Sequence, residues 1–404
     1  MTDAGRLEAA HAPAGVRDPA ARPAPGVLRV SRGALHPARE ARIEAEVRAG
    51  DGDAAGRDEV LILVGGPPPS VSIPRLRTLH EPASGVRAHV RAVAGALRLH
   101  RPRVVHAHGF DAAIVARLAS WRTGLRPLRV YEVHGAVAFE SLYRNRGPLR
   151  WARFAALYAL ETAAILLSSR LLLVSDEIAR YYPAARLRPR VSVPRLVAEP
   201  AGDASPVADA ELDRFRAFAR TARAKVAPIA VYSGGTAAWQ LTRETIALMA
   251  ALERDAGFRV AVLTTEPGEF TALAREGGAP VEGWFVGRLA RESVGAALGA
   301  CQVGVILRDD VVLNRVASPT KLYEYLHAGL AVVTTAGVPA GAAAITRTGN
   351  GVVADLRALR SDPGYARSLA ASVLDVVRKR GDRPAAAAPD GGEDGWAALR
   401  ELYR

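Results

Sequence analysis

The chain has 404 residues, 49% of them hydrophobic, which describes a globular protein with enough apolar material for two domains. A formal net charge of +13 favours anionic partners, whereas the single cysteine, Cys301, excludes an internal disulfide framework. The arginines are spread along the chain and no recognition motif accompanies them, so we expect no nucleic-acid partner. The N-terminus lacks a secretory pattern, which favours a cytoplasmic location.

The first residues, 1–25, are rich in Ala, Pro and Gly without any period and predict a disordered leader. A strand is expected at 27–30, a helix at 37–48 and a stronger strand at 60–64. This alternation is typical of a doubly wound α/β domain.

Two further predicted strands end in His-Gly, at 104–109 and 129–135, with helices at 85–100 and 111–121 around the first. Because the carboxyl ends of parallel strands lie at one edge of a sheet, His134 would stand beside a cleft there. The alternative for His134 is a structural role in the sheet. No His, Cys or Asp spacing indicates a metal cage, so we expect no metal.

A long helix is predicted at 147–169, followed by a strand at 171–175 and, before the interdomain linker, one at 191–194. The apolar run 154–174 is interrupted by charge, which favours a buried helix leading into a strand over a membrane span. Arginines with Tyr143 and Trp151 at the helix start are compatible with peripheral contact with an anionic membrane. A solvated arginine face is the alternative.

The second half opens with a polar linker and helix at 198–225, then a strand at 229–233 that runs into Gly234-Gly235. Paired glycines let a diphosphate approach the backbone closely. Further strands are expected at 259–263, 281–286 and 351–354, a helix at 363–378 and a short terminal helix at 396–403.

The most informative stretch is a strand–loop–helix–strand unit with strands at 303–307 and 331–335. Ser318 and Pro319 are typical of a helix N-cap and first position, and Lys321 follows where a capping box would have Glu or Gln. A cation in the first turn opposes the helix dipole, which is understandable if an anion binds there with Thr320 and Lys321. A solvated surface lysine is the alternative.

Two residues extend this predicted anion site. Arg308, at the end of the preceding strand, could add a second cation. Glu324 lies one helical turn after Lys321 and could accept hydrogen bonds from a ribose, or simply pair with Lys321. Phosphate and ribose together indicate a nucleotide.

The whole stretch from Leu307 to Val333 resembles the donor-site signature of retaining GT-B glycosyltransferases of family 4. The resemblance implies a donor site at Gly234, Gly235, Asn314, Ser318, Thr320, Lys321, Leu322 and Glu324. It also implies catalytic roles for His134, Lys321 and Arg308, and places Gly33 and Glu140 on the acceptor side. The basic pair that many relatives carry after the 229–233 strand is absent here.

These observations predict a GT-B fold, an α/β architecture of two Rossmann-like domains facing across a cleft. The expected domains are 26–197 for the acceptor and 198–385 for the donor, with a linker and terminal helix, 386–404, crossing back to the first. The expected activity is sugar transfer from a nucleotide diphospho-sugar to a glycan, lipid-linked or small-molecule acceptor, with retention and without a metal or cofactor. A sugar-nucleotide epimerase and a non-catalytic partner subunit are the alternatives.

Overall fold

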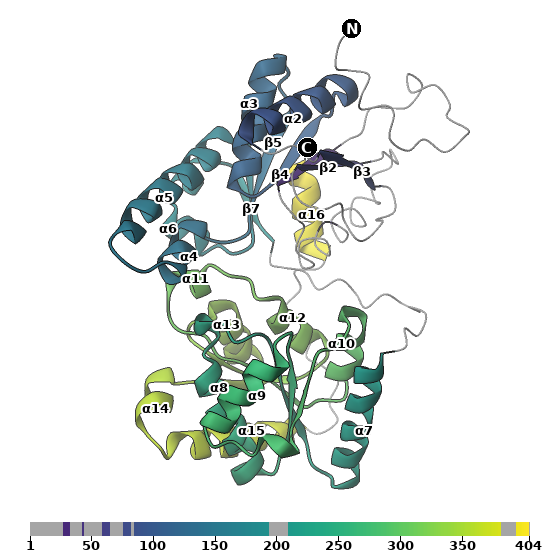
Figure 1. Cartoon of the computed structure of the whole chain (residues 1–404), viewed down its shortest axis with the longest axis vertical. Helices are drawn as coiled ribbons and strands as arrows, with labels where there is room; N and C mark the ends of the chain where they lie inside the picture. Colours follow the sequence, from purple (N-terminus) through teal and green to yellow (C-terminus); the bar gives the residue numbers. More distant parts are fainter. Residues whose placement is uncertain are drawn as a thin grey trace, which may run out of the picture.

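A computed structural model describes residues 27–32, 43, 59–64, 76–81, 85–193, 209–380 and 393–403, which form two α/β domains along the long axis of the molecule (Figure 1). The predicted leader, Gly33 and the predicted helix at 37–48, apart from the buried helical residue Ile43, lie outside the described residues. Within the described part of the chain, every helix is too short or too polar to cross a membrane.

The N-terminal domain is built on a seven-stranded, fully parallel sheet with the order β3-β2-β1-β4-β5-β6-β7. The strands are β1 (Val27–Arg32), β2 (Glu59–Val64), β3 (Leu76–Glu81), β4 (Val104–His108), β5 (Leu128–Val133), β6 (Arg170–Leu173) and β7 (Arg190–Ser192). The helices are α2 (Val86–His100), α3 (Phe110–Thr123), α4 (Val137–Arg144), α5 (Leu149–Leu167) and α6 (Ile178–Tyr181). Strand order reverses between β1 and β4, as in a doubly wound sheet.

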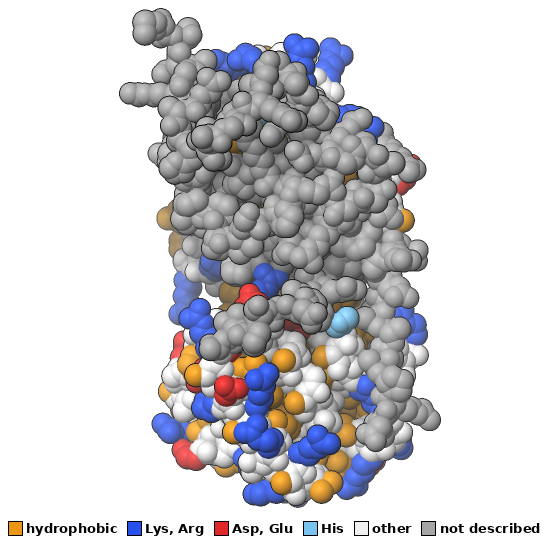
Figure 2. Space-filling view, turned by 90° about the vertical axis from the view of Figure 1, so that its right-hand side faces the viewer, with side chains coloured by type: hydrophobic (Ala, Val, Ile, Leu, Met, Phe, Trp, Pro, Cys, Tyr) orange, Lys and Arg blue, Asp and Glu red, His pale blue; other side chains and the backbone are white. Residues whose placement is uncertain are grey.

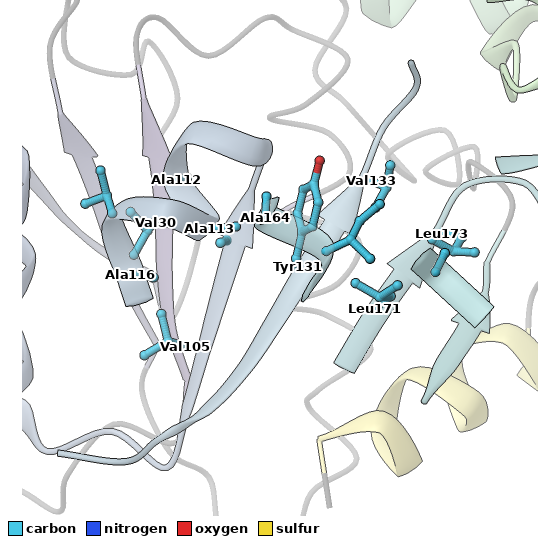
Figure 3. Close-up of a cluster of buried hydrophobic side chains, with 14 of the residues drawn as sticks. Val30, Val105, Ala112, Ala113, Ala116, Tyr131, Val133, Ala164, Leu171 and Leu173 are labelled. Atoms are coloured by element: carbon cyan, nitrogen blue, oxygen red, sulfur yellow. The ribbon is translucent and has the colours of Figure 1, made fainter. Parts of the chain in front are cut away.

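Alternate residues of these strands face opposite sides of the sheet. On one side, Val105 and Tyr131 pack against α2, α3 and α5 in a core rich in alanine, which lets the helices approach closely (Figure 3). On the other side, Val104, Val130 and Leu172 pack against Leu399 of the last helix, α16 (Glu393–Leu402).

Helix α16 therefore belongs to the first domain although it comes last in the chain, and Figure 1 shows it beside β7. Two arginines of the N-terminal domain bind carbonyl groups at the C-terminal end of α16. Arg170 of β6 donates to Leu402 O at 2.6 Å and to Glu401 O at 3.1 Å. Arg103, which directly precedes β4, donates to Tyr403 O at 3.2 Å. Cations at this end also complement the helix dipole.

The C-terminal domain has a six-stranded parallel sheet with the order β10-β9-β8-β11-β12-β13. Its strands are β8 (Ile229–Ser233), β9 (Arg259–Leu263), β10 (Phe285–Gly287), β11 (Val303–Ile306), β12 (Ala331–Thr335) and β13 (Gly351–Ala354). Its helices are α7 (Ala210–Ala224), α8 (Thr242–Ala256), α9 (Pro267–Glu276), α10 (Arg291–Leu298), α11 (Val312–Arg315), α12 (Thr320–His327), α13 (Pro339–Thr348), α14 (Leu356–Ser361) and α15 (Tyr365–Arg380).

On the face shown in Figure 2, the Lys and Arg side chains of this domain are scattered among hydrophobic and polar groups rather than gathered into one patch. This distribution matches the spread of arginines along the sequence. The positive charge therefore does not by itself mark a binding surface on that face.

Three expectations about individual elements were wrong. Residues 281–283 form a turn of 3-10 helix, and the strand beyond it is β10. The loop after β11 contains the single-turn helix α11. Helix α5 is not buried, because only Glu161, Ala164 and Ile165 of its 19 residues are inaccessible. Its many alanines and leucines gave an apolar run that does not correspond to a buried surface.

Candidate active site

The predicted donor residues meet at the point where strand order reverses in the second sheet. Gly234 directly follows β8, and Arg308 follows β11, the neighbouring strand. Lys321 lies in the first turn of α12, which begins beyond the same edge of the sheet. Ligands of open α/β sheets bind at such a switch point, so the three residues stand where a nucleotide is expected.

The Lys321 side chain turns inward to the paired-glycine turn. Its Nζ donates to Gln240 Oε1 at 3.0 Å and lies 4.9 Å from the centre of the Tyr232 ring. A Cβ atom at position 234 would overlap this amine, so the lysine fits only because residue 234 is glycine. Burial lowers the pKa of Lys321 well below its ordinary value, the nearby Arg308 lowers it further, and Glu324 opposes both effects.

Tyr232 and Gln240 were not predicted as site residues. The Tyr232 hydroxyl lies 2.8 Å from Gln240 Oε1 and 2.7 Å from Gly235 O, so it ties the turn to the residue that holds Lys321. Glu266 holds the other side of the turn by accepting from Thr236 N at 2.8 Å and from Thr236 Oγ1 at 2.9 Å. The position of Tyr232 in β8 could be predicted from the sequence. Its contacts with the turn and with Lys321 could not, because they depend on how the loops fold.

Arg308 is held at the end of β11 by its own backbone. Thr335 Oγ1 accepts from Arg308 N at 3.0 Å and donates to Arg308 O at 2.6 Å. The guanidinium donates to Trp239 O at 3.4 Å, and burial lowers its pKa. Two cations, Arg308 and Lys321, are thus held close to each other, an arrangement that an anion would stabilise.

Asn314 comes from α11 and is buried. Its amide donates to Asp309 O at 3.0 Å and to Trp239 O at 3.4 Å, which links the loop after β11 to the turn after β8. Asn314 therefore supports the loop that carries Arg308. Asp310 of this loop pairs with Arg315, so the acidic pair 309–310 does not form a cation site of its own.

The start of α12 differs from the prediction. Pro319, and not Ser318, is the N-cap residue, and no side chain caps the helix there. Ser318 is buried and lies 3.4 Å from the Tyr323 hydroxyl. Thr320 is the first helical residue, Leu322 is in the core, and Glu324 is partly buried one turn further on. Backbone N–H groups of the first turn, which a Ser318 cap would have used, point away from the helix and suit an anion.

In the N-terminal domain, His134 follows β5 and α4 begins three residues later. Glu161, from α5, accepts from Val137 N and Ala138 N, both at 2.9 Å, and so caps α4 from another helix. Tyr182 donates to the same carboxylate at 2.5 Å. Burial raises the pKa of Glu161, and these hydrogen bonds oppose the rise. Glu140 is engaged by Arg144 on its own helix at 2.7 Å.

A column of three histidines leads from the terminal helix to His134. The rings of His106 and His108 stack with centres 4.5 Å apart, and those of His108 and His134 with centres 5.8 Å apart. All three rings direct a nitrogen to Glu132 Oε2, at 3.4 Å from His106, 2.8 Å from His108 and 3.6 Å from His134. Glu132 and the first two histidines are buried in the sheet.

His106, His108 and Glu132 have the donor atoms of a metal site and lie close enough together to share an ion. The buried Arg29 argues against that use, since its guanidinium lies 3.0 Å from His106 Nδ1 and balances the charge of Glu132. Arginine only donates, so this contact leaves His106 Nδ1 unprotonated and its proton on Nε2, towards Glu132. A metal at this position would have to displace that proton and would lie beside the buried positive charge of Arg29.

The two candidate regions lie on elements that contact each other. Helix α4, just after His134, packs against α11, just after Arg308. The Arg144 guanidinium lies 5.9 Å from the Trp239 ring centre, and Val316 is part of the N-terminal core. Because α4 and α11 each follow the carboxyl end of a strand, these edges of the two sheets face each other (Figure 1).

This arrangement of two parallel-sheet domains agrees with solved glycosyltransferase structures. Sucrose-phosphate synthase from Thermosynechococcus elongatus has a TM-score of 0.59 and 14% identity, covering 95% of this chain and 98% of that one. The lipopolysaccharide outer core galactosyltransferase WaaB has a TM-score of 0.57 and 12% identity, with coverage of 93% and 98%. HepE from Anabaena, in complex with UDP and glucose, has a TM-score of 0.56 and 13% identity, with coverage of 93% and 99%.

The protein therefore has the GT-B fold of the glycosyltransferases, as the sequence predicted. Residues 35–193 of the chain match the profile of Glycosyltransferase Family 4. No curated protein sequence matches the chain.

Proposed function

We propose that the protein transfers a sugar from a nucleotide diphospho-sugar to an acceptor with retention of the anomeric configuration. The observation that carries this proposal is the convergence of Lys321, Arg308 and the paired glycines at the switch point of the second sheet. Two cations with lowered pKa values and a helix N-terminus without a side-chain cap form an environment there that would stabilise a bound anion. HepE, a structural neighbour, was solved with UDP and glucose, which supports a nucleotide-sugar donor.

In this proposal, the diphosphate binds between the glycine turn and the start of α12. Lys321, Arg308 and Thr320 stabilise the negative charge that develops on the leaving diphosphate. Such electrostatic stabilisation of the transition state is usually the largest single contribution to catalysis. Glu324 accepts hydrogen bonds from the ribose. His134 contacts the transferred sugar or the acceptor hydroxyl, with Glu140 nearby on α4. These groups supply positive charge without a metal ion, so turnover should persist in EDTA.

The acceptor side of the proposal includes contact with an anionic membrane. Tyr143, Arg146, Leu149, Arg150, Trp151 and Arg153, here called the α5 patch, are all exposed around the start of α5. The one acidic residue of α5, Glu161, is buried on the other side. Exposed aromatic and aliphatic groups among arginines suit a lipid surface, and a lipid-linked acceptor would enter beside α4.

Thermal shifts with UDP, GDP, ADP and their sugar conjugates test the donor proposal. Millimolar ligand should stabilise the wild type even at a weak site, and the stabilisation should be lost in Lys321→Ala. Glu324→Ala should lose most turnover while the fold persists. Product formation without any acceptor would instead indicate an epimerase, and binding without turnover or hydrolysis until a second protein is added would indicate a partner subunit. NMR of the product anomer tests retention.

A further inference from the structure

One loop of the C-terminal domain crosses into the core of the N-terminal domain. Residues 309–316, here called the bridging loop, join β11 to α12 and include the short helix α11, which lies beside α4 (Figure 1). Val316 is completely buried, in the core that also contains Val105 and Tyr131 of the N-terminal sheet, and Val312 packs against the same core. The C-terminal domain therefore contributes apolar side chains to the core of the other domain.

Polar contacts with the N-terminal domain also hold the bridging loop. Arg315 pairs with Asp310, which raises the pKa of the guanidinium, and a hydrogen bond with the Tyr181 side chain of α6 acts in the same direction. Partial burial raises the pKa of Tyr143 on α4, and the charge of Asp309 raises it further. The charged groups of the loop therefore face α4 and α6.

The beginning of the bridging loop is fixed to the C-terminal domain instead. Gly337 lies so close to it that a Cβ there would overlap the carbonyl groups of Arg308 and Asp309. Asn314 donates to Asp309 O at 3.0 Å and to Trp239 O at 3.4 Å, and the Arg308 guanidinium donates to the same Trp239 O at 3.4 Å. Because Asn314 and Arg308 share one acceptor, a movement of α11 changes the surroundings of Arg308.

We infer that Val316 is a positioning residue for Arg308, since it anchors the bridging loop in the N-terminal domain while Asn314 connects the loop to the donor site. The inference rests on the proposed function in one respect, that the donor diphosphate binds at Arg308. If the two domains separated, the loop would have to leave the N-terminal core or lose its contact with Trp239. Nucleotide binding at Arg308 and docking of α11 on α4 should therefore strengthen each other, because coupling between two sites is reciprocal.

The first test places a serine at one valine at a time and measures nucleotide affinity by titration calorimetry. UDP, GDP and ADP are compared first, and the one that stabilises the wild type most is used throughout. Val316→Ser should weaken its binding about tenfold, because a buried hydroxyl disfavours the docked position of the loop. Val115→Ser is the matched control, since it places a hydroxyl in the same core from α3. It should lower the melting temperature but keep the affinity within about twofold of wild type.

A second variant, Tyr181→Phe, leaves both valines in place and removes only the hydroxyl that Arg315 contacts. It should weaken binding of the same nucleotide about threefold. Hydrogen exchange adds a measurement that a purely structural role of Val316 would not change. In the wild type, the nucleotide should slow exchange in α4, although α4 belongs to the other domain, and Val316→Ser should lose this protection.

X-ray scattering of the ligand-free protein tests the anchor without a nucleotide. Val316→Ser should have a larger radius of gyration than the wild type and Val115→Ser. Equal radii, unchanged exchange in α4 or an equal loss of affinity in both serine variants would each overturn the inference. If no nucleotide binds the wild type, the proposed function is removed and the scattering result still decides whether Val316 is an anchor. Wild-type affinity in Val316→Ser would remove the inference alone.

Discussion

Lys321 and Gly234 compete for one small volume, because the amine of the lysine lies where any Cβ at position 234 would have to be. The glycine is required by a side chain from another element, since its own backbone torsion is not in the left-handed region. The sequence predicted both residues in one site, with the glycine there to let a diphosphate approach the backbone. The structure shows that the lysine already uses the space.

Gly234→Ala should displace Lys321 and weaken donor binding while leaving the fold intact. Two of the groups that the new methyl meets, the ends of Lys321 and Gln240, belong to flexible side chains that can move aside, whereas the third, the Tyr232 hydroxyl, belongs to a buried ring. The expected loss is about tenfold in nucleotide affinity, or roughly 1.4 kcal/mol, measured by titration calorimetry.

Gly95→Ala is the matched control. Gly95 lies inside α2 and a Cβ there meets nothing, so the change should stabilise the protein by roughly 0.5–1 kcal/mol and leave nucleotide binding unchanged. Wild-type affinity in Gly234→Ala would show that the position of Lys321 is unimportant.

Lys321→Met should make the ligand-free protein more stable at pH 7 and abolish stabilisation by nucleotides. Folding lowers the pKa of Lys321, so the folded state binds its proton less tightly than the unfolded state. The resulting cost is present at neutral pH and disappears above the unfolded pKa, near pH 10.4. The expected gain is about 1 kcal/mol in the free energy of unfolding, from denaturant melts.

The other two lysines, Lys225 and Lys379, are exposed and provide controls. Their methionine variants should change stability by less than about 0.5 kcal/mol and bind nucleotide normally. A destabilised Lys321→Met protein would contradict the inferred cost of burying this lysine beside Arg308.

Glu161→Ala should destabilise the N-terminal domain by about 1–3 kcal/mol, because two backbone N–H groups and the Tyr182 hydroxyl lose their acceptor. Burial raises the pKa of Glu161, so its contribution is fullest below the unfolded pKa, near 4.3, and declines as pH rises through the folded value. The difference from wild type in chemical denaturation should therefore shrink from pH 4 to pH 7. Glu282→Ala, which removes an exposed pair with Arg275, should have almost no effect.

The α5 patch predicts binding to vesicles containing phosphatidylglycerol but not to vesicles of phosphatidylcholine alone. The double variant Leu149→Ala/Trp151→Ala, at side chains 80% and 57% exposed, should lose most of this binding. Leu99→Ala/Trp121→Ala removes equally exposed groups, at 74% and 78%, from α2 and α3 and should bind like wild type. Equal losses in both would point to general surface hydrophobicity rather than to the patch.

The regular elements and the GT-B fold could be predicted from the sequence because strand and helix patterns are local. The β11–α12 unit also contains residues that mark the beginning and the end of its helix. Ser318 failed as a cap because Pro319, next to it, takes the N-cap position in an extended conformation. The partners of Lys321 could not be predicted, since Tyr232 and Gln240 reach it only through the pairing of β8 with β11. Glu132 was not predicted as part of a cluster for the same reason. It lies beside His106 and His108 only because β5 pairs with β4.

The placement of α16 sets an order of events during synthesis. Val27, Val104, Val130 and Leu172 pack against Leu399 and Leu402, which leave the ribosome only after the whole second domain. This apolar side of the first domain's sheet therefore stays uncovered by α16 until the second domain has been translated. A chain truncated after residue 392 would keep both sheets but would aggregate through the uncovered side of the first one. Faster expression should increase this aggregation.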